Sequence, residues 1–127
     1  MPKRVSRVGK KSIKQIKSIK QIIMTKFKVV PVTFPSTTGR EQTVSGHADF
    51  IGPGTIKSAG VALNGFDVNY KSGDHHLGDL KINCTNSPSF TGLHVDFSVN
   101  LLLRDFSGTI DDPYGGSVDV LVMADIS

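Results

Sequence analysis

The stretch Leu93-His-Val-Asp-Phe-Ser-Val-Asn-Leu101 decides the fold of this chain. Leu, Val and Phe alternate in it with His, Asp, Ser and Asn over the whole length. A period of two residues is that of a β-strand with one buried and one solvated face. We therefore predict a strand here, with its apolar side chains facing a core.

Runs of the same kind recur on both sides of this strand, at a spacing of roughly ten residues. Gly, Pro, Ser and Asp, the residues that form turns, separate them. The runs cover 27–34, 43–51, 56–68, 77–84 and 117–124. The pattern predicts an all-β fold, an antiparallel β-sandwich of about six strands. A small open barrel has the same period and remains the alternative.

The runs also predict which side chains face the core. Pro31 and Pro35 favour an edge strand, because proline donates no hydrogen bond to a neighbouring strand. Leu80, Ile82 and Cys84 form the inward face of their run, which makes Cys84 an inert core thiol. In 56–68, alternation predicts two opposite faces, one with Val61, Leu63 and Gly65 and the other with Asn64, Phe66 and Val68.

Charge divides the chain into two parts. The first 28 residues hold ten Lys or Arg and no Asp or Glu, whereas the remainder holds five against eleven. Fields of opposite sign attract different ligands, so we expect the two parts to face different partners. The predicted organisation is a basic N-terminal arm over 1–28 and a β-sandwich domain over 29–127.

The arm contains a repeated hexapeptide, Lys-Ser-Ile-Lys-Gln-Ile, at 11–16 and 17–22. On a helical wheel the isoleucines gather on one side and the lysines on the other, which predicts a short amphipathic helix. Its candidate contact residues are Lys10, Lys11, Lys14, Lys17 and Lys20. Nucleic acid, an anionic membrane surface or a partner's groove would suit it, and a solvated extension stays open too. Met24 is a plausible alternative start of translation.

The densest polar cluster lies at 72–79, where two adjacent histidines stand between aspartates. Its candidate ligand contacts are Asp74, His75, His76 and Asp79. Carboxylates and imidazoles can bind the hydroxyl groups of a sugar. A divalent cation is a weaker alternative, because neighbours on a strand point to opposite faces, and a solvated turn is the plain one. We expect no metal site.

A second polar loop runs from 104 to 116. Its candidate ligand contacts are Arg104, Asp111, Asp112 and Tyr114. We expect Arg104 to pair with Asp105, Asp111 or Asp112 and so to hold the loop in place. A loop of this length in a compact domain is usually functional, and a subunit contact is the alternative to a ligand contact.

Catalysis, cofactors and membrane insertion have no support in the sequence. No nucleophile elbow, zinc-protease helix or phosphate-binding glycine loop occurs, so we expect neither an enzyme nor a cofactor. A single cysteine excludes an internal disulfide. Lysines interrupt every apolar run near the N-terminus, so we expect no signal peptide and no transmembrane segment. Localisation stays open, with release from a cell or association with a virion both compatible.

Residues 56–124 resemble the H-type lectin domain. The similarity rests on Val61-Ala-Leu-Asn-Gly-Phe, Asp79-Leu-Lys-Ile-Asn-Cys84, Phe90-Thr-Gly-Leu-His-Val95 and Val118-Asp-Val-Leu-Val-Met-Ala124. The resemblance implies a six-stranded antiparallel sandwich that forms trimers and binds sugar through clustered polar loops. The tryptophans that the family carries in its late strands are absent here.

Two functional hypotheses follow from the sequence. The first is a non-enzymatic, carbohydrate-binding β-sandwich module that forms a homo-oligomer, with a trimer favoured. The alternative is a structural protein of a virion or phage-like particle, in its shell or fibre. In that case the basic arm contacts nucleic acid or a neighbouring subunit.

Overall fold

The computed structural model describes residues 22–71, 76–85, 87–105 and 112–127, and these residues form an all-β fold. No helix occurs among them. Asp74, His75 and Asp111 lie outside the described residues, as do the candidate contact lysines of the arm, Lys10, Lys11, Lys14, Lys17 and Lys20. The strands are β1 (Met24–Thr37), β2 (Gln42–Asp49), β3 (Ile56–Tyr70), β4 (Leu77–Cys84), β5 (Ser89–Thr91), β6 (His94–Asp105) and β7 (Tyr114–Ile126). The all-β prediction is thus confirmed, and β1 starts within the predicted arm.

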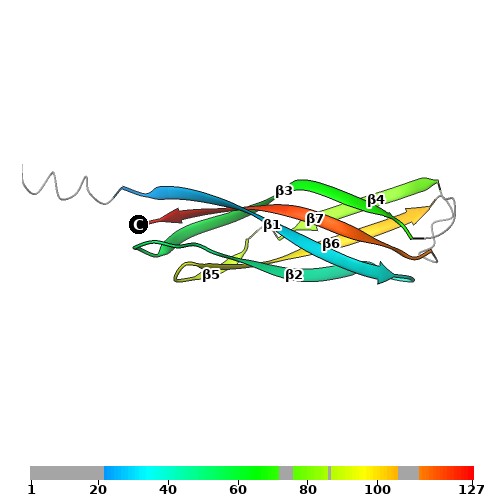
Figure 1. Ribbon diagram of the computed structural model, residues 1–127, viewed down its shortest axis with the longest axis horizontal. Coiled ribbons are helices and arrows are strands. Elements are labelled where there is room, and N and C mark those ends of the chain that lie inside the picture. Colours follow the sequence, from blue (N-terminus) through cyan, green and yellow to red (C-terminus); the bar gives the residue numbers. More distant parts are fainter. Residues whose placement is uncertain (1–21, 72–75, 86, 106–111) are drawn as a thin grey trace, which may run out of the picture.

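The strands form two antiparallel sheets (Figure 1). Sheet A has the order β1-β7-β3. Sheet B has the order β2-β6-β4, and β5 pairs with the first residues of β6. The two most regular strands of the sequence, β6 and β7, are therefore the central strands of their sheets. The predicted edge strand with Pro31 is indeed at an edge, since β1 pairs only with β7.

One core lies between the two sheets. From Val118 to Ile126 every second residue of β7 is buried, and these residues meet the apolar face of β6 from the other sheet. Leu80, Ile82 and Cys84 pack against this core from β4, as the alternation predicted. Burial raises the pKa of the Cys84 thiol, which is the behaviour of a core cysteine and not of a nucleophile.

The alternation in β3 departs from the prediction. Val61 and Val68 both pack against the core, although strict alternation put them on opposite faces. The register with β7 shifts between Leu63 and Gly65, and the extra residue reverses the inward and outward positions beyond it. Leu63 and Phe66, on either side of this shift, stay exposed. A bulge of this kind has no signature in the apolar pattern.

The two sheets have unlike outer faces. The outer face of sheet A carries apolar side chains in neighbouring register rows, and Phe27 and Val29 on β1 are 62% and 47% exposed. The outer face of sheet B carries polar residues in almost every row. Leu102, the large apolar residue there, is nearly buried. The outer face of sheet B is therefore polar, whereas the outer face of sheet A exposes apolar side chains to solvent.

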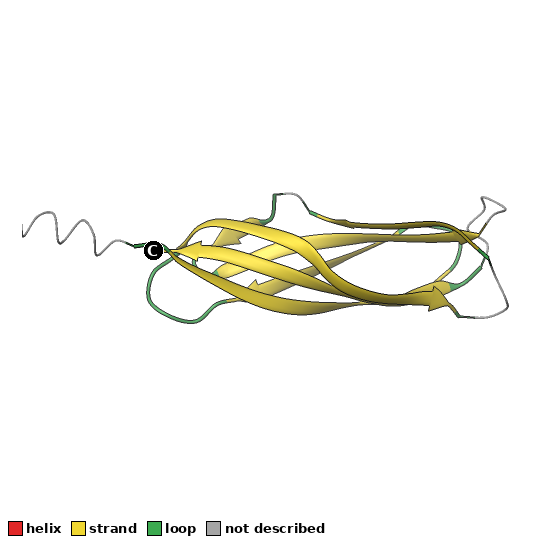
Figure 2. Ribbon diagram, turned by 90° about the horizontal axis from the view of Figure 1, so that it is seen from above, coloured by secondary structure: helices red, strands yellow, loops and turns green. Residues whose placement is uncertain are grey.

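The long strands give the body two distinct ends, and most of the described connections lie at these ends (Figure 2). At the terminal end lies the C-terminus, where Ser127 and Thr55 exchange backbone hydrogen bonds. At the opposite end, which we call the loop end, β1, β3 and β6 finish and β2, β4 and β7 begin. The described residues that flank the two predicted polar loops lie at the loop end.

Candidate functional site

The loop end brings together segments that are distant in the sequence. The backbone N–H of Lys71, after β3, donates a hydrogen bond of 2.9 Å to the carbonyl oxygen of Pro113, before β7. The residue that precedes the first predicted loop therefore contacts the second one. Asp112 precedes Pro113 in the chain, and both His76 and Asp112 interact with another group of the protein.

Asp79 and Arg104, two predicted ligand contacts, form an ion pair with each other. Nη2 of Arg104 donates to Oδ2 of Asp79 over 2.6 Å. The two residues are direct neighbours in the register of β4 and β6. The prediction gave Arg104 a partner within its own loop, and the structure shows a partner on the adjacent strand, Asp79. The register between β4 and β6 places the two side chains next to each other, although they are distant in the sequence.

Tyr114 lies fully buried in the core, and this corrects its assignment as a ligand contact. Its hydroxyl lies 2.6 Å from the carbonyl oxygen of Arg40 and 3.0 Å from that of Leu101, and it donates to them. Gln42, also buried, donates from Nε2 to the carbonyl of Tyr114. Burial raises the pKa of the Tyr114 hydroxyl. From its place in the core, Tyr114 thus holds the connection between β1 and β2 in position.

A hollow of about 380 Å³ lies above this buried pair, partly open to solvent. Its walls come from the end of β1 and the start of β2, which belong to opposite sheets. We call it the Arg40 hollow, and its lining residues are Pro35, Thr37, Arg40, Glu41, Gln42, Thr43 and Val44. It offers a guanidinium donor, a carboxylate acceptor, two hydroxyls and an apolar surface. Its volume falls within the range of small-ligand sites.

An ion pair connects the hollow to the polar face of sheet B. Nζ of Lys81 lies 3.6 Å from Oε1 of Glu41. Lys81 is the register partner of Leu102, and Glu41 precedes the residue that pairs with Leu101. The pair therefore spans the position of Leu102, which explains why this outward leucine is nearly buried. The Asp79–Arg104 pair lies two residues further along β4 and β6, toward the loop end.

Sequence analysis did not identify the residues of the Arg40 hollow. Arg40 and Glu41 form part of a short polar connection, Thr-Thr-Gly-Arg-Glu, with no distinctive motif. Their position beside Tyr114 depends on the pairing of β1 with β7 and of β2 with β6. An isolated Arg-Glu next to a turn glycine is the only local signal, and it is a weak one.

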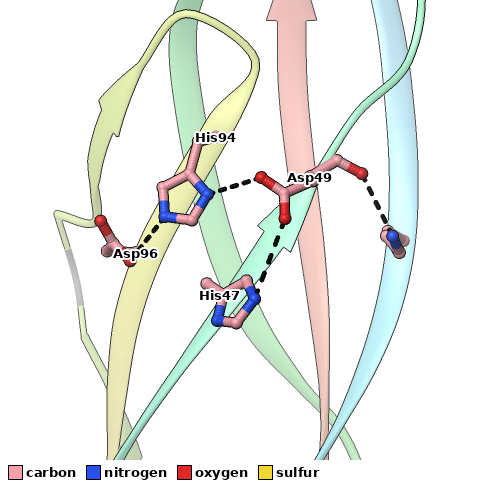
Figure 3. Close-up of polar contacts among 5 residues, drawn as sticks. His47, Asp49, His94 and Asp96 are labelled. Carbon is pink, nitrogen blue, oxygen red and sulfur yellow. Dashed lines mark hydrogen bonds and ion pairs between the residues drawn. The ribbon is translucent and has the colours of Figure 1, made fainter.

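A second polar cluster, also missed by the sequence analysis, lies toward the terminal end on the outer face of sheet B (Figure 3). Nδ1 of His94 lies 2.6 Å from Oδ1 of Asp49, and its Nε2 lies 2.8 Å from Oδ1 of Asp96. His47 stacks on His94 with 5.3 Å between ring centroids. Lys28 donates to the backbone carbonyl of Asp49 and so joins the cluster to sheet A.

The electrostatics of this cluster follow from its geometry. Hydrogen bonds to Asp49 and then to Asp96 raise the pKa of His94, because both carboxylates favour the imidazolium. The bond to His94 lowers the pKa of Asp49. All four side chains are exposed to solvent. Within the residues that the structure describes, no group of three or more His, Cys, Asp or Glu side chains is arranged to hold a metal ion.

Two further findings bear on the function of the protein. Across the described ranges, no helix has the length and apolar character needed to cross a membrane. Comparison with known protein families, curated proteins and solved structures finds no match to this chain. We therefore infer the function from the geometry of the molecule.

Proposed function

We propose that this protein is a non-enzymatic β-sandwich binding module that recognises carbohydrate at its loop end and acts as a homo-oligomer, with a trimer favoured. The observation that carries the proposal is the Arg40 hollow. It lies at the loop end, where Lys71 and Pro113 are hydrogen-bonded, and its size suits a sugar ring.

The chemistry of the hollow supports a sugar over a purely apolar or purely charged ligand. A sugar presents hydroxyl groups around its rim, which pair with the carboxylate of Glu41 and the guanidinium of Arg40. Its C–H faces need an apolar surface, which Pro35 and Val44 supply. Two antiparallel sheets around one core supply a rigid scaffold for such a site.

A glycan array with the full chain, followed by calorimetry on the strongest hit, tests the proposal. We expect Arg40→Ala to weaken binding about tenfold, equivalent to about 1.4 kcal/mol. Lys57→Ala is the matched control, because it removes one exposed positive charge outside the Arg40 hollow. The proposal is wrong if no glycan binds at millimolar concentration, or if the two variants lose affinity equally.

A structural role in a virion or phage-like particle is the second candidate. The exposed apolar outer face of sheet A favours it, since such a face commonly packs against another subunit. This role predicts large assemblies, and retention on nucleic acid that falls steeply with salt because the arm lysines neutralise phosphates. Light scattering and a salt-dependent retention assay distinguish it from the lectin-like role.

A further inference from the structure

The outer face of sheet A contains a continuous apolar band. In its register rows, Phe27 lies beside Met123, and Val29 beside Leu121. Gly60 and Ala62 on β3 complete the same two rows. We call these six residues the apolar band. A Cβ added to Gly60 would touch Cε of Met123 at 3.5 Å, so the methionine side chain lies flat over the sheet.

Polar rows border the apolar band on both sides. In one row, Asp125 accepts hydrogen bonds from the hydroxyls of Thr25 and Ser58, over 2.6 and 2.8 Å. In the other, Asp119 lies between Pro31 and Gly65. The acidic residues of the central strand therefore lie at both ends of an apolar surface. A ligand that combines an apolar side with positive charges at its margins fits this arrangement.

The N-terminal arm has that combination. Its isoleucines fall on one side of a helical wheel and its lysines on the other. Ile22 and Ile23, the last of this series, are 72% and 54% exposed on the body. A helix of this length is marginal in water unless an apolar surface supports it. Nucleic acid would neutralise the lysines but would leave both the isoleucines and the apolar band in water.

The path of the chain indicates which copy receives the arm. Between Ser18 and Val30 there is no Gly, Pro, Asn, Asp or Ser. These are the residues that favour reverse turns, and the arm would need such a turn just before β1 to lie on its own sheet. A neighbouring copy can be reached without one. We propose that the arm of one copy docks its isoleucine side on the apolar band of a second copy of this chain.

Cross-linking between two single-cysteine chains tests this proposal. In a Cys84→Ser background, one full chain carries Ile16→Cys and a second, of different tagged mass, carries Val29→Cys. Docking raises the local concentration of the two thiols to about the millimolar range. After oxidation, we expect at least about tenfold more mixed disulfide than with the control chain Ser45→Cys. Ser45 is exposed on the outer side of sheet B.

The native mass supplies a second test that does not depend on disulfide chemistry. Light scattering should show that Ile16→Lys with Ile19→Lys reduces the mass of the full chain to that of a smaller species. Ser18→Lys, on the lysine side of the same wheel, should leave the mass unchanged. Equal cross-linking to Val29 and Ser45 positions overturns the proposal. So does an unchanged mass in the isoleucine variant, including the case in which that variant loses only bound nucleic acid.

This inference is independent of the carbohydrate site. The apolar band lies on sheet A, whereas the Arg40 hollow joins the end of β1 to β2 and the polar side of sheet B. Arm variants should therefore leave sugar affinity per site unchanged, apart from the avidity of an assembled particle.

Discussion

Tyr114 was predicted to contact a ligand, whereas in the structure it is a buried residue that binds backbone carbonyl groups. Its sequence context, Asp-Pro-Tyr-Gly, indicates a turn in a loop that was predicted to contact a ligand. In the structure the ring is buried and its hydroxyl donates to the backbone of Arg40 and Leu101. The residue supports the Arg40 hollow without lining it.

We expect Tyr114→Phe to lower the free energy of unfolding by about 1–2 kcal/mol, because it leaves buried carbonyl oxygens without their donor. Urea unfolding of the full chain measures this. Ser45→Ala, an exposed hydroxyl deletion on β2, should change stability by less than about 0.5 kcal/mol. A Tyr114→Phe protein as stable as the native one would mean that the two hydrogen bonds contribute nothing.

The His94 cluster gives the protein a pH dependence of defined sign. The pKa of His94 is raised, so its contribution is complete below the ordinary value of 6.5 and is lost as the pH rises through the raised value. The pKa of Asp49 is lowered, so its contribution is complete above 3.8 and is lost as the pH falls through the lowered value. The cluster therefore stabilises most between these limits.

We expect the advantage in melting temperature of the native protein over His94→Gln to shrink between about pH 5 and about pH 8. The effect is small because the side chains are exposed. A titration of His94 by nuclear magnetic resonance should give a pKa above 6.5, and Asp96→Asn should lower it. An advantage that grows with pH would contradict the assigned contacts.

At the scale of the elements, β7 is tightly confined between β1 and β3 near the loop end. Gly116 has a φ of 145° and pairs with both Phe34 and Val68. A Cβ at this position would lie 2.1 Å from the carbonyl oxygen of Asp67. Only glycine allows the backbones of β7 and β3 to approach in this way.

Gly116→Ala should therefore destabilise the protein by at least about 2 kcal/mol, since backbone and not a flexible side chain must move. Gly92→Ala is the control. It also has a positive φ, of 62°, but no atom lies within 4 Å of the added Cβ. Its cost should be limited to about 1 kcal/mol of backbone strain. Equal losses in the two variants, measured by denaturant unfolding, would argue against the close approach.

The elements were largely predictable from the sequence, whereas their pairing was not. The alternation of 93–101 predicted β6 and its buried face, because every outward position there is polar. The bulge in β3 was not predictable, since a shift of register leaves the residue types unchanged. The contact of His94 with Asp49 depends on a pairing between strands 45 residues apart in the sequence, and no local pattern encodes such a pairing.

At the scale of the whole molecule, the outer faces of the two sheets differ in polarity. The polar side of sheet B is satisfied by its own ion pairs and hydrogen bonds, as in Thr43 to Asn100 and Lys81 to Glu41. In the apolar band on sheet A, Phe27 and Val29 are exposed to solvent and the other four residues are partly buried. The sequence predicted the charge division between arm and body, but not which face of the body lacks a cover.

Residue-resolved nuclear magnetic resonance titration tests the central proposal, carbohydrate binding at the loop end, most directly. The full chain is titrated with glucose, galactose, mannose and N-acetylglucosamine, each to about 10 mM, enough to detect millimolar affinity. We expect saturable shifts at Arg40–Val44 for at least one sugar, with the amides of His94 and Asp96 unchanged. Shifts confined to the His94 cluster, or no saturable shift with any sugar, would contradict the account.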